Sequence, residues 1–103
     1  MAYLVQILLP LFDNNQRRFP KRHYAEIAAL LTDTFGGLTA YNRAPAEGLW
    51  KDGPARTQRD DIVVYEVMVK ALNRKWWRRF RRDLESHFRQ DAIVIRAQAI
   101  KVL

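Results

Sequence analysis

The sequence predicts an α+β fold in which two helices cover one face of a four-stranded antiparallel sheet. Two observations predict it. Segments with strand and helix patterns follow one another in the order βαββαβ, and no linker or low-complexity stretch divides them. Because 49% of the 103 residues are hydrophobic, the chain can form a core, and we expect one domain over residues 1–103.

The N-terminal half supplies a strand and a helix. Residues 2–12 predict a strand that is apolar on both faces and therefore central in the sheet, with Pro10 at its end or at a bulge. Residues 19–35 predict a helix with Pro20 in its first turn and Gly36 as a left-handed C-cap. Its apolar stripe comprises Tyr24, Ile27, Ala28, Leu30, Leu31 and Phe35.

The remaining elements follow from the same two periodicities. Residues 38–44 predict a short strand, after which a long connection carries glycine and proline. Residues 61–72 are dense in β-branched side chains and predict the clearest strand of the chain. Residues 73–91 predict a helix with an aromatic and aliphatic stripe, and residues 92–103 predict the last strand.

This order of elements is the ferredoxin-like, split βαβ arrangement. Right-handed crossovers then give the strand order last, first, third, second, with both helices on one face. The other face carries rows that are too apolar for water, which predicts a homodimer whose sheets pack face to face. Those rows are Leu4, Gln6, Leu8, then Ile62, Val64, Glu66, Met68, then Val94, Arg96, Gln98, Ile100.

On this order of elements, nearly the whole chain resembles the dimeric α+β barrel superfamily, which includes small monooxygenases, haem-degrading enzymes and stress-response barrels. The stretch "FGGLTAYNRAPAEGLW" is also similar to a segment of small bacterial proteins of unknown function. The resemblance implies a homodimer and, if the protein is an enzyme, proton transfer or cofactor-free oxygenation. It supplies no catalytic residue for this chain, so whether the protein is an enzyme stays open.

The apolar face contains polar side chains on adjacent strands, and these can converge. We expect a small, partly apolar ligand here, with candidate binding residues Gln6, Tyr41, Trp50, Glu66, Arg96 and Gln98. Two interpretations of Glu66 and Arg96 stay open: a buried structural ion pair, or polar anchors for the ligand. Trp50 either covers the pocket as part of a lid or packs against the neighbouring chain.

Several other kinds of site are not predicted. The pair Gly36-Gly37 follows a helix and precedes a strand, which is the wrong polarity for a phosphate loop. His23 and His87 lack further ligands at metal spacing, and no catalytic triad can be proposed from spacing. The chain has no cysteine, so disulfides and thiolate sites are excluded, and no cofactor is expected.

The chain is basic, with a formal charge of +7 and a pI of about 10.3. The alternative function is therefore a nucleic-acid-binding module that uses the second helix. Helical spacing directs Trp77 and Phe80 to the core, however, and Asp83 and Glu85 interrupt the positive charge, so a solvated basic face is favoured. The residues of the alternative are Lys75, Arg78, Arg79 and Arg82.

The N-terminal segment lacks the basic region that precedes the apolar run of a secretory signal. Its apolar run is also too short to span a bilayer. We therefore expect a cytoplasmic protein with no membrane partner.

Overall fold

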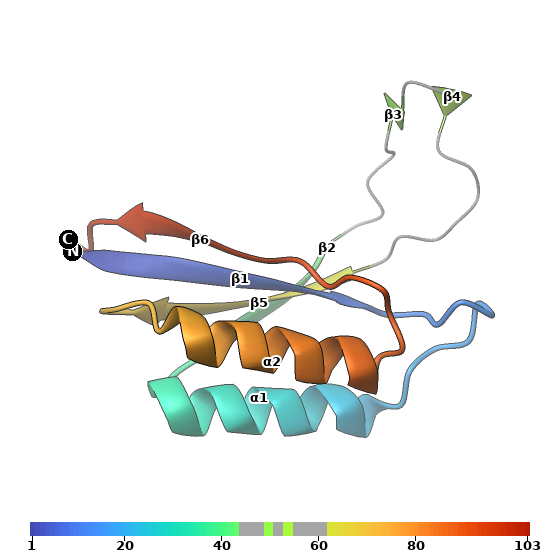
Figure 1. Ribbon diagram of the computed structural model, residues 1–103, viewed down its shortest axis with the longest axis horizontal. Coiled ribbons are helices and arrows are strands. Elements are labelled where there is room, and N and C mark those ends of the chain that lie inside the picture. Colours follow the sequence, from blue (N-terminus) through green and yellow to red (C-terminus); the bar gives the residue numbers. More distant parts are fainter. Residues whose placement is uncertain (44–48, 51–52, 55–61) are drawn as a thin grey trace.

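The computed structural model describes residues 1–43, 49–50, 53–54 and 62–103, with side chains described for 1–40 and 62–103. It confirms the α+β fold and the predicted order of the main elements (Figure 1). In chain order the elements are β1 Ala2–Pro10, α1 Lys21–Phe35, β2 Thr39–Arg43, β3 Leu49–Trp50, β4 Gly53–Pro54, β5 Ile62–Val69, α2 Arg74–His87 and β6 Ile95–Ile100.

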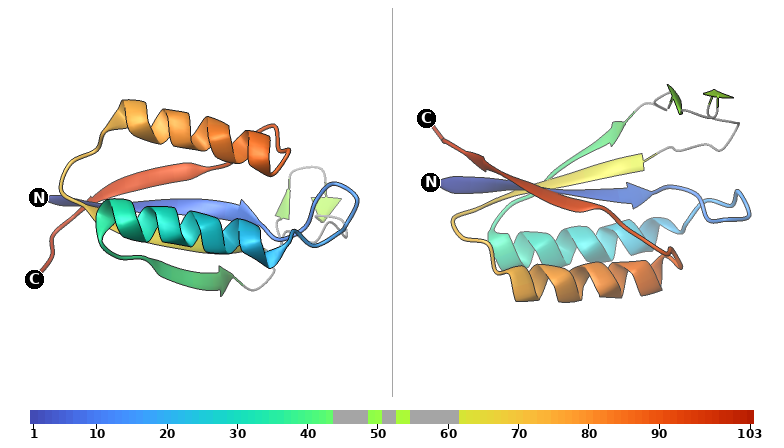
Figure 2. Two further views of the ribbon diagram at one scale, coloured as in Figure 1. Left: turned by 90° about the horizontal axis from the view of Figure 1, so that it is seen from below. Right: turned by 45° about the horizontal axis from the view of Figure 1, so that its top comes forward.

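The main sheet has four strands in the order β2-β5-β1-β6, as predicted, and the neighbouring strands are antiparallel. This topology is that of a ferredoxin-like fold. Strands β3 and β4 form a separate short ribbon within the segment predicted as a long connection. Both helices lie on the same side of the main sheet and run antiparallel to each other (Figures 1 and 2). In the part of the chain that the structure describes, no helix is long and apolar enough to cross a membrane.

The core lies between the sheet and the helices, and alternation along the strands supplies it. Val5, Ile7 and Leu9 of β1 are almost completely buried. They point toward the helices, while the intervening residues point to the other face. Burying each such side chain stabilises the fold by about 1.5–3 kcal/mol relative to leaving it exposed. The core is completed by Ile27, Leu31, Val63, Tyr65, Val67, Val69, Trp77, Phe80, Leu84, Phe88 and Ile93.

Helix α1 ends at Phe35 as predicted and begins at Lys21, two residues later than predicted. Gly36 adopts the left-handed conformation (φ 83°), and its N–H donates to the Thr32 carbonyl at 2.8 Å. Pro20 is the N-cap rather than part of the first turn, with ψ 143°. The Phe19 N–H donates to the Leu11 carbonyl, which keeps the chain extended up to the helix.

Helix α2 begins after an N-cap, because the Asn73 side chain accepts a hydrogen bond from the Trp76 N–H at 3.1 Å. It ends at His87, earlier than predicted, and Arg89 shortly after it takes a left-handed conformation (φ 51°). Strand β6 also starts later than predicted. The Ile93 N–H donates to the Glu85 carboxylate at 3.1 Å instead of joining the sheet.

Candidate ligand site on the open face of the sheet

A row of polar side chains crosses the face of the sheet that the helices leave open. The strand register places Gln6 of β1 directly opposite Glu66 of β5 on one side and Arg96 of β6 on the other. Thr39 of β2 extends the row, because it pairs with Glu66. All four therefore share one face of the sheet.

Gln6 joins the two charged members of this row, and we call Arg96, Gln6 and Glu66 the polar row. The Gln6 Nε2 donates to the Glu66 Oε2 at 2.5 Å, and the Arg96 Nε donates to the Gln6 Oε1 at 2.8 Å. An amide is suited to this position because it can donate to a carboxylate and accept from a guanidinium at once. The structure thus brings together three of the candidate residues, with the Gln6 amide between the Glu66 carboxylate and the Arg96 guanidinium.

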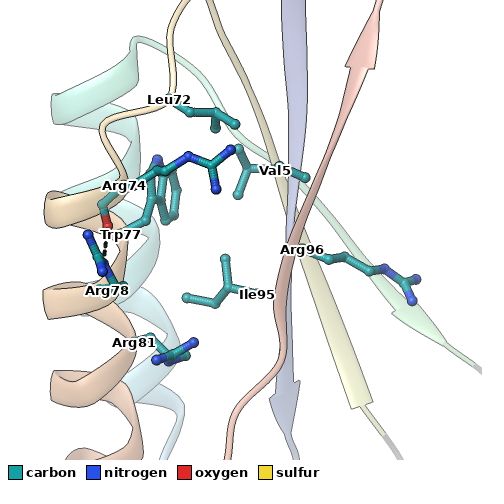
Figure 3. Close-up of a pocket in the computed structure, with 9 residues that line it drawn as sticks. Val5, Leu72, Arg74, Trp77, Arg78, Arg81, Ile95 and Arg96 are labelled. Atoms are coloured by element: carbon teal, nitrogen blue, oxygen red, sulfur yellow. Dashed lines mark hydrogen bonds between the residues drawn. The ribbon is translucent and has the colours of Figure 1, made fainter.

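The polar row is not buried in a single chain. Gln6 and Glu66 are half-buried, and Arg96 is exposed. A guanidinium has five N–H donors, and the bond to Gln6 uses one of them. The Arg96 side chain extends away from α2 on the open side of the sheet, where a further acceptor could reach it (Figure 3).

Gln98 lies on the same face of β6 but outside the polar row. It is opposite Leu4, two residues further along the strand than Arg96, and it is exposed. The structure places the backbones of Tyr41 and Trp50 on β2 and β3. Their side chains lie outside the described residues, so the prediction that they cover a ligand stays a prediction.

Apolar side chains flank the polar row on the open face. Met68 of β5 and Val94, just before β6, are 59% and 52% exposed. Val64, in contrast, is only 2% exposed, although it belongs to the same face of β5. The other flanking residues, all half-buried, are Leu4, Leu8, Ile62 and Ile100. The open face therefore combines a polar centre with an apolar surround, which is the composition of a ligand site or of an interface core.

The basic residues of the alternative function lie on the surface of α2, and Arg78 among them also borders a groove beside β6. Lys75, Arg78, Arg79 and Arg82 are all exposed, as the helical spacing predicted. The aromatic residues between them are not available for stacking on bases. Trp77 and Phe80 are buried, and the half-buried Trp76 stacks on Phe80 with ring centroids 5.1 Å apart.

The two histidines lie side by side, which the sequence pattern did not indicate. The His23 and His87 rings lie 4.1 Å apart, because the start of α1 lies beside the end of α2 in the antiparallel pair. The pKa of His23 is lowered, first by burial and then by the neighbouring charges of His87 and Arg22, while Glu26 opposes the shift. Among the residues with described placement, no group of three potential metal ligands occurs, so the histidine pair is not a complete metal site.

Comparison of the chain with models of known families, with curated proteins and with solved structures gives no match. The residues and their arrangement are therefore the basis for inferring what the protein binds.

Proposed function

We propose that this protein is a cytoplasmic homodimer that binds a small, partly apolar molecule against the polar row. One observation carries the proposal: a hydrogen-bonded chain of charged and amide groups lies at the centre of an open sheet face that is largely apolar around it. The resemblance to the dimeric α+β barrels supports the same arrangement at the level of the fold.

The dimer part of the proposal follows from the apolar surround. Contiguous exposed apolar surface on a small protein usually marks an interface, and a second copy offers the same surface by two-fold symmetry. Packing two such faces together would remove Met68 and Val94 from water in both chains.

The ligand part follows from the polar row. If the face is covered, the free donors of Arg96 lose water and need new acceptors, because an unpaired buried donor costs about 1–3 kcal/mol and a charged one more. A ligand with a carbonyl or carboxylate group would supply them. Its apolar part would lie against the flanking side chains.

Sedimentation velocity at micromolar concentration tests the dimer. We expect a dimer for the native chain and a shift to monomer for Met68→Lys. The matched control is Leu30→Lys, because Leu30 is 46% exposed on α1, away from the open face, and its replacement should leave the dimer intact. A monomeric native protein would contradict the proposal.

Ligand binding is tested by a thermal-shift screen of small aromatic and aliphatic carbonyl compounds, followed by calorimetry on any compound that stabilises the protein. We expect Arg96→Gln to weaken the binding about tenfold or more, since a charge-assisted hydrogen bond is lost. Arg22→Gln is the charge-matched control, because Arg22 is exposed on α1, away from the polar row, and its replacement should retain the affinity. Equal losses in both variants would argue against a site on the polar row.

The second candidate is binding of nucleic acid along α2, and the observation that favours it is the group of exposed cations on that helix. It predicts retardation of DNA or RNA that weakens steeply as salt is raised. Loss of the shift in Arg79→Gln/Arg82→Gln would support it. Absence of any shift at low salt would remove it.

A further inference from the structure

A groove opens on the helix side of the sheet, between α2 and the edge strand β6 (Figure 3). Its volume is about 440 Å³. Val5, Leu72 and Ile95 contribute apolar surface, and Trp77 forms part of the wall. The backbone of Arg96 borders the groove, but its side chain extends to the opposite side of the sheet, where the other members of the polar row lie.

Small side chains on the edge strand explain why the space is there. Val5 is opposite Ala97 in the register, so Ala97 faces the helices as Val5 does. Ala97 and Ala99 carry only a methyl group on this row, and both stay exposed although they are on the helix side. A larger aliphatic residue at position 97 would fill the space.

Three arginines of α2 border the groove: Arg74, Arg78 and Arg81. Their spacing of four and three residues places them along one side of the helix. No acidic side chain is among the residues that line this groove. Arg74 extends from the helix toward the strands, while the Arg78 Nε donates to the Arg74 carbonyl at 3.3 Å (Figure 3). The residues that line the groove therefore supply only positive charge.

This arrangement is unfavourable for the isolated helix. Like charges four residues apart repel, and a cation in the first turn opposes the helix dipole. The first turn of α2 contains no acidic residue. An anion in the groove would relieve both effects, and arginine can hold a carboxylate or phosphate through two parallel hydrogen bonds.

From the charge and the apolar lining together, we infer that the groove between α2 and β6 binds an organic anion with an apolar body. The head group, a carboxylate or a phosphate monoester, pairs with the arginines. The apolar body lies against Trp77 and Ile95. A nucleic-acid backbone fits less well, since it would leave the apolar lining without a partner.

Calorimetric titration tests the inference with octanoate and octyl phosphate, which carry the two head groups on one chain, and with octylammonium as the cationic counterpart. We expect one or both anions to bind and the cation not to bind. The better of the two anions identifies the head group. Equal binding of anions and cation would overturn the inference, because it would show a merely apolar site.

A charge-matched pair of variants locates the site. Arg74→Gln/Arg81→Gln removes two lining cations and should weaken anion binding about tenfold or more, since charge-assisted hydrogen bonds are lost. Arg79→Gln/Arg82→Gln removes the same charge from residues that do not line the groove and should retain the affinity. Equal losses in the two double variants would overturn the inference in favour of general attraction to a basic surface.

Ala97→Leu gives an independent test, because it fills the groove and leaves every arginine in place. It should abolish anion binding. If this variant does not fold, the comparison of the two double arginine variants still tests the inference. If it folds and binds octanoate as the native chain does, the groove is not the site. Displacement of octanoate by a single-stranded oligonucleotide, sensitive to Arg79→Gln/Arg82→Gln, would also overturn the inference and favour nucleic acid.

Discussion

The adjacent glycines 36 and 37 allow a direct test of whether this pair is a helix stop or a ligand loop. Gly36 has a left-handed backbone (φ 83°), whereas the φ of Gly37 lies outside that region. A Cβ atom added at either position meets nothing within 4 Å. Replacement by alanine therefore tests backbone conformation alone, without a steric clash at either site.

The two alanine replacements should change the stability of the protein in opposite directions. Alanine in the left-handed region costs about 1–2 kcal/mol. Restriction of the unfolded chain returns about 0.4–1 kcal/mol. Gly36→Ala should therefore destabilise the protein by about 1 kcal/mol, while Gly37→Ala should stabilise it by about 0.4–1 kcal/mol. Asparagine tolerates the left-handed region, so Gly36→Asn should lose less than Gly36→Ala.

Urea and thermal unfolding at one fixed protein concentration measure these differences. For a domain of about this size, 1 kcal/mol corresponds to a shift in Tm of about 4–8 °C. Equal effects of the two alanine variants would show that the left-handed backbone of Gly36 does not decide its contribution to stability. A loss of ligand binding in variants that remain stable would also contradict the helix-stop interpretation, because it would indicate that the glycines belong to a ligand loop.

Three further predictions concern caps and titrating groups. Asn73→Ala should cost about 1 kcal/mol in urea unfolding by removing the acceptor for the Trp76 N–H, whereas Asn73→Asp should keep it. Burial raises the pKa of Tyr24 from 10.0 to about 12. The contribution of Tyr24 to stability should therefore be complete below pH 10 and fall as pH rises toward 12. An ordinary tyrosine pKa in an ultraviolet titration would contradict this prediction. The pKa of His23 is lowered, first by burial and then by His87, so the stability of the protein should fall as pH drops below about 6.5. His23→Gln should flatten that part of the profile of stability against pH. An unchanged profile in this variant would contradict the prediction.

The elements, and the side of each element that faces the core, follow from the residue pattern alone. Alternation made Val5 and Val67 inward-facing, and helical spacing did the same for Trp77 and Leu84; all four are buried. Local chemistry also identified the stop of α1 at Gly36. These features could be predicted because they depend on periodicity and on the backbone preferences of single residues.

The element ends were less predictable, because distant partners decide them. Strand β6 begins at Ile95, and just before it the Ile93 N–H donates to the carboxylate of Glu85, a residue of α2. The histidine pair was also not predictable, since nothing local to either helix terminus indicates that the ring centroids of His23 and His87 lie 4.1 Å apart.

The connections between the candidate residues depend on how the strands pair, which the residue pattern does not reveal. Alternation could place Gln6, Glu66 and Arg96 on one face, but register decides which of them are opposite one another. Because of that register, the Gln6 amide links Glu66, which is 60 positions further along the chain, to Arg96, which is 90 positions further along. The groove likewise depends on the tertiary packing of α2 beside the short side chain of Ala97, and neither element reveals it alone.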